Sequence, residues 1–287
     1  MNQPARQSRP SLSHWIRFFL SRGAFALLVS LISAFFALPM LWLLLTPFNA
    51  RGTLAVEIPA QPTLANFQRV FANAFAMHAL VNSAILGLGG MLLVTLVATL
   101  AAYSLARTDV PGRDLFVYGL ILFSSVVTGT AAMVPIFMMI FYLGLIDTHL
   151  AVILVCTGGL LPTATFIMRD FIEGLPRSYE ESALVSGATP WQMFRDVVLP
   201  LVRPGMMVVA IWAFVNVWGT FLIPFILLRS PQNMPATVAI YSFYTEAGTP
   251  IITLTSAYSL LFGLPVLFLY LFVNWRYGFR FFGGIKR

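Results

Sequence analysis

Long apolar segments constrain this chain more than any other feature, because each of them is long enough to cross a lipid bilayer. About 20 apolar residues in a helix span the ~30 Å of bilayer hydrocarbon. Segments of this kind occur at 25–47, 79–105, 115–141, 149–168, 205–228 and 252–275. Inside lipid a segment must satisfy its own backbone polar groups, and a helix does so without a partner. We therefore predict an all-α membrane protein with six transmembrane helices.

Composition agrees with this class and argues against other classes. Hydrophobic residues make up 59% and charged residues 9% of the 287 residues, against about 45–50% and about 25% in soluble domains. The net charge of +7 does not indicate a nucleic-acid partner, because the arginines are scattered between apolar segments. The one cysteine, Cys156, excludes a disulfide within the chain, and its apolar neighbours favour a buried, unreactive thiol.

Basic residues gather in alternate connectors between the predicted spans. They precede the first span, follow the second, occur four times in residues 169–203 and close the chain. The opposite connectors hold only Arg51, Arg69 and Arg229. Cytoplasmic connectors carry an excess of Lys and Arg. The predicted organisation is therefore a cytoplasmic segment at 1–24, a six-span domain at 25–275 with a cytoplasmic loop at 169–203 between the fourth and fifth spans, and a cytoplasmic tail at 276–287. Residues 1–24 lack a cleavage signal, so the first span is read as an uncleaved anchor.

The polar residues 169–203, which we call the paddle, carry two helix-start signals in succession. Ser178 and Glu181 have the spacing of a capping box, in which each side chain bonds the backbone of the other residue. Gly187 supplies a stop, because glycine adopts the left-handed conformation beyond a helix without steric cost. The first half of the paddle is therefore predicted to be a short helix.

A second start signal follows at once. Thr189 and Gln192 form another capping-box pair, and Pro190 occupies the first helical position, where its missing N–H costs nothing. We expect this helix to end at Leu199-Pro200. One face of it carries the apolar side chains of Trp191, Phe194 and Val198. The paddle is thus predicted to be a helix-turn-helix element presented to a partner.

The spacing within the paddle resembles the EAA loop of ABC importer permeases. Glu181-Ser182-Ala183, three residues, Gly187, nine residues, Val197, one residue and Leu199-Pro200 keep every interval of that loop. In this family the loop forms coupling helices that sit in a groove on a cytoplasmic ATPase subunit. The resemblance implies that ATPase docking involves Glu180, Glu181, Ser182, Ala183, Gly187, Trp191, Phe194, Leu199 and Pro200. The alternative is an ordinary cytoplasmic connector that happens to be helical.

Sequences outside the paddle are similar to the second permease subunit of carbohydrate-type importers. The matching segments are Asn82-Ser83, Ala106-Arg107, Pro111-Gly112-Arg113, Trp218, Phe221-Leu222, 234–238 and 283–286. Gly219-Thr220 departs from the pattern of that subfamily. The resemblance implies a bacterial plasma-membrane protein that works with a second homologous permease subunit, two ATPase subunits or domains, an extracytoplasmic binding protein and a sugar. The mechanism it implies is alternating access, with the central cavity opening outward when the ATPases close.

Three residues of the spans are candidates for the substrate pathway: Asn82, Asn216 and Trp218. A buried amide can bond a sugar hydroxyl, and an indole can stack on a sugar face. Packing between helices is the alternative role for each of them.

Catalysis by this chain is not expected. Its one lysine, Lys286, belongs to no phosphate-binding glycine loop, and its histidines have no metal-ligand spacing. We therefore expect no cofactor on this chain, with ATP and Mg²⁺ bound by partner ATPase subunits. No acidic residue lies deep in a span, which makes ion-coupled transport the weaker interpretation. Two alternatives stay open: an importer permease for amino acids, peptides or phosphate, and a membrane enzyme or scaffold whose paddle recruits a cytosolic protein.

Smaller signals predict how the spans pack and what lies outside them. Gly87, Gly89 and Gly90 allow a neighbouring helix to approach closely. Apolar residues that follow Thr63 at helical spacing predict a short external helix at the membrane surface. The loop 229–250, rich in proline and aromatic residues, is predicted to be a semi-rigid external segment.

Overall fold

The computed structural model describes residues 12–108, 112, 115, 118–119, 122 and 130–277. Over these residues the chain is helical, and the β pairing is limited to one bridge between Tyr244 and Pro250. The helices long and apolar enough to cross a membrane are Phe25–Phe48, Ala74–Arg107, His149–Glu173, Pro190–Trp218 and Ile252–Trp275. They coincide with five of the six predicted spans. Part of the third predicted span, 115–141, lies outside the described residues, and its end forms part of α5 (Met133–Tyr142).

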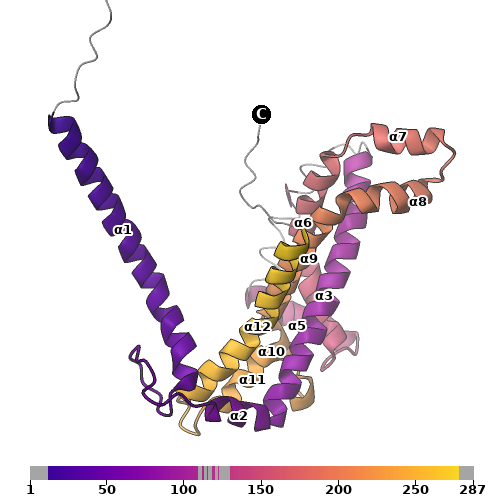
Figure 1. The fold of residues 1–287 in the computed structure, drawn as a ribbon. Helices are drawn as coiled ribbons and strands as arrows, with labels where there is room; N and C mark the ends of the chain where they lie inside the picture. The colour runs from indigo at the N-terminus through magenta and orange to yellow at the C-terminus, as the bar shows by residue number, and fades with distance from the viewer. Residues whose placement is uncertain are drawn as a thin grey trace, which may run out of the picture.

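Three helices form the centre of the molecule: α3 (Ala74–Arg107), α6 (His149–Glu173) and α9 (Leu199–Trp218). One buried cluster joins Ala98 and Ala102 of α3 to Met168 of α6 and to Val209 and Ala213 of α9. The small alanine side chains let the helix backbones come close together, which is how helices gain contact area where water does not drive their association. Figure 1 shows the three helices running side by side along the bundle.

Glycines on α3 make this packing possible, as the sequence predicts. A Cβ added to Gly87 would lie 2.8 Å from Phe214 Cε2, and one added to Gly90 would lie 2.8 Å from Val217 Cγ2. On another face of α3, a Cβ on Gly89 would lie 2.5 Å from Ile153 Cδ1. These distances are shorter than van der Waals contact. Glycine is therefore required at these points for α9 and α6 to pack against α3.

Helix α1 (Leu12–Leu45) stands apart from the centre (Figure 1). None of its most apolar window is buried within the chain, whereas 39% of the corresponding window of α3 is buried. Its C-terminal end is fastened by Trp42, which donates a hydrogen bond to the Thr53 carbonyl at 3.0 Å. The outward face of α1 is apolar and is suited to lipid or to another membrane chain.

The short helix predicted after Thr63 is present as α2 (Ala65–Ala72). It is anchored to the chain, because the buried Asn66 amide donates hydrogen bonds of 2.8 Å to the carbonyls of Pro47 and Asn49. The side chain of Val70, a residue of α2, is fully buried and also holds the helix against the chain.

The fifth predicted span, 205–228, is a helix with a break. Helix α9 ends at Trp218, and the chain turns before α10 (Leu222–Leu227). The segment that follows contains short helical pieces, Pro231–Asn233, α11 (Ala236–Ala239) and Ile240–Phe243, and leads into α12 (Ile252–Tyr277). Gly219 and Thr220 therefore mark a change of direction rather than the interior of a helix.

Candidate functional site

The paddle projects from one end of the bundle, and α2 and α11 lie at the opposite end (Figure 1). It contains α7 (Ser178–Val185) and α8 (Pro190–Met193), joined by a turn at Gly187. Gly187 has φ +86°, so the predicted left-handed glycine is confirmed. Nothing lies within 4 Å of a Cβ added there, which means that the backbone conformation, and not crowding, requires the glycine.

The capping box predicted for the first paddle helix is wrong. The residue before α7 is Arg177, which has helical backbone angles and makes no side-chain cap. The helix instead continues a turn that begins at Pro176, whose carbonyl accepts a hydrogen bond from Tyr179 N at 3.3 Å. The Arg177 carbonyl accepts from the backbone N–H groups of Glu180 and Glu181, both at 3.0 Å. Because a tight turn already satisfies the orphan N–H groups, no Ser178 cap is needed and the Glu181 carboxylate is exposed.

The second capping box is confirmed. Thr189 N donates to Gln192 Oε1 at 2.8 Å, and Gln192 N donates to Thr189 Oγ1 at 3.3 Å. Pro190 occupies the first turn of α8, as predicted.

The predicted end of this helix at Leu199-Pro200 is wrong. From α8 the chain passes through one π-helical segment, Phe194–Val198, and continues without a break into α9. Pro200 falls in the first turn of α9, a position at which the chain tolerates its missing N–H. A proline inside a helix cannot donate the usual backbone hydrogen bond. The wider π-helical turn before Pro200 accommodates that missing bond without ending the helix. The paddle and the fifth span are therefore joined by one unbroken helix, which changes direction between α8 and α9 (Figure 1).

A charged contact joins the paddle to the end of α3. Arg107 lies 2.6 Å from the Glu180 carboxylate, and the two side chains are only 13% and 12% exposed. Arg107 Nη2 also donates to the carbonyls of Ile172 and Leu175, at 3.1 and 3.2 Å. The Tyr103 hydroxyl donates to Glu180 at 3.3 Å. We call this group of contacts the Arg107 bracket; it links α3, the end of α6 and α7.

An apolar floor lies beneath the bracket. The ring of Phe194 is buried against Tyr103, with ring centroids 4.8 Å apart. Val198 is also buried, and Phe171 fills the space left by Gly205 so closely that an added Cβ there would lie 2.5 Å from its Cγ. The base of the paddle is thus fixed by packing as well as by charge.

The outer surface of the paddle is exposed and partly apolar. Its large exposed apolar side chains, which together we call the apolar face, are those of Tyr179, Leu184, Val185 and Trp191, of which Val185 is 89% exposed. Large apolar side chains left exposed on a polar segment are suited to contact another macromolecule.

The nine residues predicted for docking separate into an exposed and an inner group. Those on the surface are Glu181, Ser182, Gly187 and Trp191, while Ala183, Leu199 and Pro200 are half-buried. Glu180 and Phe194 face inward. The sequence also missed Arg107 as a site residue, because its partner Glu180 lies 73 positions along the chain and a basic residue after a span signals only orientation.

The three substrate-pathway candidates occupy different environments. The Trp218 indole lies between Phe214 and Phe262, with centroid distances of 5.3 and 5.0 Å, and its N–H donates to the Phe262 carbonyl at 3.1 Å. Asn82 is buried and donates to two loop carbonyls. Asn216 is exposed, and its amide donates to the Trp212 carbonyl at 2.7 Å. In this conformation the first two side chains pack between elements.

At the end opposite the paddle, hydrogen bonds hold the segment 229–236. Asn82 donates to the carbonyls of Gln232 and Met234 at 2.7 and 3.0 Å, and Ser83 accepts from Ala236 N at 2.9 Å. The His149 ring makes a 3.0 Å contact with the Asn233 carbonyl. We call this group of contacts, together with those of Asp147, the external bracket, after the orientation predicted for this end of the chain.

Asp147 is the one charged member of this bracket. It accepts from the hydroxyl and backbone N–H of Ser230 and from Arg229 N, and its own carbonyl accepts from Asn233. The hydrogen bonds from Ser230, and next from Arg229, hold the pKa of Asp147 well below its ordinary value. Its φ of +62°, unusual for a non-glycine residue, places the carboxylate for these contacts.

No cluster of His, Cys, Asp or Glu among the described residues could hold a metal ion. Cys156 is buried in α6, as predicted.

Residues 98–278 match the family model described as binding-protein-dependent transport system inner membrane component. The match covers α6, the paddle, α9 and all of α12. It therefore includes both the paddle and the Arg107 bracket.

Among relatives, the chain is 34% identical to the diacetylchitobiose uptake system permease protein NgcG of Streptomyces coelicolor, over 72% of this chain and 68% of the relative. It is 28% identical to the maltodextrin transport system permease protein MdxG of Bacillus subtilis, over 86% and 90%. It is 30% identical to the trehalose transport system permease protein SugB of Mycobacterium tuberculosis, over 76% and 80%.

The fold is also similar to a solved chain of a bacterial ABC transporter involved in the import of the acidic polysaccharide alginate. The TM-score is 0.77 at 19% identity, covering 94% of this chain and 100% of the other.

Proposed function

Because the chain belongs to the family of binding-protein-dependent transport system inner membrane components, we propose that it is the permease subunit of an ATP-driven importer for carbohydrates. The observation that carries the proposal is the paddle, a segment that presents an exposed apolar face while buried contacts fix its base. A docking element needs both properties, because it must bind a partner and pass the partner's movement to the spans.

The ATPase partner docks on the apolar face of the paddle, around Val185 and Trp191. Differences in docking between the two nucleotide states drive the change of access, since a partner shifts an equilibrium only by its difference in affinity. ATP and Mg²⁺ are bound and ATP is hydrolysed on that partner, and this chain itself holds no cofactor.

The cargo is a carbohydrate. Relatives of this chain are named for the uptake of diacetylchitobiose, maltodextrin and trehalose, and their similarity extends well beyond the paddle. Permeases for amino acids, peptides or phosphate are the rival within the importer class.

The chain forms half of the pathway and pairs with a second, similar permease. Large apolar side chains on the outer faces of α1 and α12, such as Phe35 and Phe268, are exposed in the single chain and are covered by that permease or by lipid. An extracytoplasmic binding protein delivers the sugar at the end that holds the external bracket. The paddle and both termini lie in the cytoplasm, a topology supported by the arginine distribution.

Reconstitution tests the proposal directly. The chain is purified together with the ATPase, the second permease and the binding protein encoded beside it, and placed in proteoliposomes that contain ATP. We expect uptake of a neutral oligosaccharide that requires ATP, the binding protein and this chain.

Two outcomes would contradict the proposal. Uptake of amino acids, peptides or phosphate, and of no sugar, would assign the chain to another importer class. An assembled complex that transports nothing, but recruits a cytosolic protein through the paddle, would favour the scaffold alternative.

A further inference from the structure

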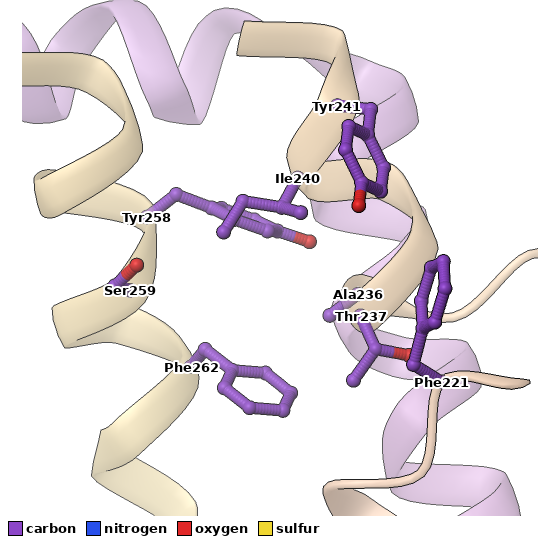
Figure 2. A pocket seen from close by; sticks show the side chains of 8 residues that line it. All are labelled: Phe221, Ala236, Thr237, Ile240, Tyr241, Tyr258, Ser259 and Phe262. Atoms are coloured by element: carbon purple, nitrogen blue, oxygen red, sulfur yellow. The ribbon is translucent and has the colours of Figure 1, made fainter. Parts of the chain in front are cut away.

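A small open cavity lies beside the break in the fifth span, between the segment that contains α11 and the first half of α12 (Figure 2). Its volume is about 290 Å³, at the lower end of the ~300–1,000 Å³ range of small-molecule sites. Phe221 comes from the break, Tyr241 from the segment after α11, and Phe262 from α12. The cavity therefore joins three parts of the chain at the end where cargo would arrive.

Aromatic rings make up much of its wall. Phe221 and Tyr241 lie with ring centroids 5.9 Å apart, and Phe262 is fixed from behind by stacking on Trp218 at 5.0 Å. In Figure 2 the hydroxyl oxygen of Tyr241 points toward the other labelled side chains, whereas the buried Tyr258 hydroxyl bonds to α3. Rigid rings of this kind offer flat apolar surfaces at little cost in conformational entropy. They suit a ligand that is itself flat and partly apolar.

Three of the four hydroxyl groups of the wall are oriented by the backbone. Thr237 donates its proton to the Thr220 carbonyl at 2.9 Å, and Ser259 donates to the Thr255 carbonyl at 2.8 Å. Tyr258 donates to the Ala76 carbonyl at 3.0 Å. A hydroxyl that has donated its one proton can only accept further hydrogen bonds. The wall thus presents hydrogen-bond acceptors to a ligand that must supply donors.

No residue that lines the cavity carries a charge. A carboxylate, ammonium or phosphate group would lose water there without gaining a counter-charge, which is costly. A pyranose ring has the opposite character, because it is neutral, carries several hydroxyl donors and has an apolar C–H face that packs on an aromatic ring.

From these features we infer that the cavity binds one neutral pyranose ring of the cargo. The inference rests on the proposed function as a carbohydrate importer and adds to it a contact made by this subunit and a preference for uncharged sugars. The limited volume restricts the contact to a single ring rather than an oligosaccharide.

Cysteine protection tests the site without transport. Ser259→Cys places a thiol in the wall, and Ser242→Cys, on the exposed residue next to Tyr241, is the matched control outside the cavity. Native Cys156 is buried and provides a low background. The whole complex is purified in a detergent without a sugar headgroup and labelled with iodoacetamide. The probes are methyl β-D-glucopyranoside and methyl β-D-galactopyranoside, with D-glucuronate and glycine as charged comparisons.

We expect one or both glycosides to slow labelling of Ser259→Cys, with the rate falling hyperbolically to about one tenth at roughly ten times the dissociation constant. Labelling of Ser242→Cys should not change. Tyr241→Ala should abolish the protection, while Tyr241→Phe, which keeps the ring, should retain most of it.

Three results would overturn the inference: no protection by either glycoside, equal protection by glucuronate, or slow labelling in lipid nanodiscs that no glycoside alters. The last result would identify a lipid chain as the occupant. Because the assay needs neither ATP hydrolysis nor uptake, the complex can pass the transport test and still fail this one, so the two proposals are separable.

Discussion

Helix α3 is held at both of its ends, but the two ends are held by different kinds of contact. At the paddle end, one side chain, Arg107, meets the Glu180 carboxylate and two backbone carbonyls. At the other end, Asn82 and Ser83 contribute to a set of mostly neutral hydrogen bonds that also involves Asp147. The Arg107 bracket depends on the side chain of one residue, whereas the external bracket depends on hydrogen bonds made by several residues.

This difference predicts how the stability of each end responds to single substitutions. Removing one partner of a buried ion pair leaves the other charge uncompensated and costs about 3–5 kcal/mol. Removing one of several neutral hydrogen bonds costs about 1–3 kcal/mol, because the neighbouring bonds persist. The paddle end should therefore fail through single substitutions, and the external end should tolerate them.

The largest effect is expected for Arg107→Gln. It leaves the Glu180 carboxylate without a cation and two carbonyls without their donor, at a cost of about 3 kcal/mol because the pair is only slightly exposed. We expect binding-protein-stimulated ATP hydrolysis in proteoliposomes to fall to its basal level. The double exchange Arg107→Glu with Glu180→Arg should restore only part of it, since a glutamate cannot donate to the carbonyls.

Asn82→Ala is the matched change at the external end. It removes two neutral hydrogen bonds of the loop and should lower stimulated hydrolysis by less than half. If Asn82→Ala and Arg107→Gln lost stimulated ATP hydrolysis to the same extent, at equal amounts of protein in the membrane, the two brackets would not differ in the way we describe.

A second large effect is expected at Gly187. Replacement by Leu forces a side chain into a left-handed conformation, which costs about 1–2 kcal/mol, and also adds bulk to the exposed turn. Stimulated hydrolysis should be lost while the subunit stays in the membrane. Gly187→Asn is the control, because asparagine tolerates this conformation, and it should retain a measurable response. Normal transport by an assembled Gly187→Leu complex would show that the paddle is not the docking element.

Glu180 and Glu181 are neighbours with opposite environments, and a matched pair of substitutions separates them. Glu180 is buried in the Arg107 bracket, while Glu181 is exposed and makes no helix cap. Glu181→Gln should leave thermal stability unchanged and reduce stimulated hydrolysis moderately, because it removes the charge that we propose contacts the ATPase. Glu180→Gln should lower both the thermal stability and the stimulated hydrolysis. If Glu181→Gln gives wild-type hydrolysis, docking depends on the apolar face alone.

The smallest effect concerns pH at the external end. The folded-state pKa of Asp147 lies below its ordinary value of about 3.9, so the stability it contributes is fully present above that value. It is lost only as the pH falls further, through the folded-state pKa. The difference in unfolding temperature between the protein and Asp147→Asn should therefore be constant from about pH 8 to pH 5 and should narrow below about pH 4. A difference that changes between pH 8 and pH 5 would assign the effect to another group.

Features set by local spacing could be predicted from the sequence. Apolar length located five of the spans, and the left-handed turn at Gly187 and the Thr189 cap each depend on residues within a few positions. The close approach at Gly87 was also predictable, because only glycine leaves room for a neighbouring helix.

Features that depend on competing contacts were missed, whether the competitor is a local turn or a distant part of the chain. The Ser178 cap is not formed because the turn from Pro176 already occupies the start of α7. Glu180 looked like a docking charge, but Arg107 turns it inward. Trp218 looked available to a sugar, but two phenylalanine rings from different helices enclose it. For Glu180 and Trp218, a partner far along the chain, Arg107 or Phe262, sets the environment of the side chain.

The continuity of the helix from Pro190 to Trp218 gives the paddle a mechanical property. Its 29 residues at 1.5 Å each give a helical path roughly 44 Å long, which bends between α8 and α9 and runs from the paddle to the aromatic stack around Trp218 (Figure 1). When this helix turns as one body by ~5°, a tip about 20 Å from the pivot moves by roughly 2 Å. A small rotation of the paddle is therefore carried, as a displacement of roughly 2 Å, to the aromatic ring of Phe262 that lines the cavity.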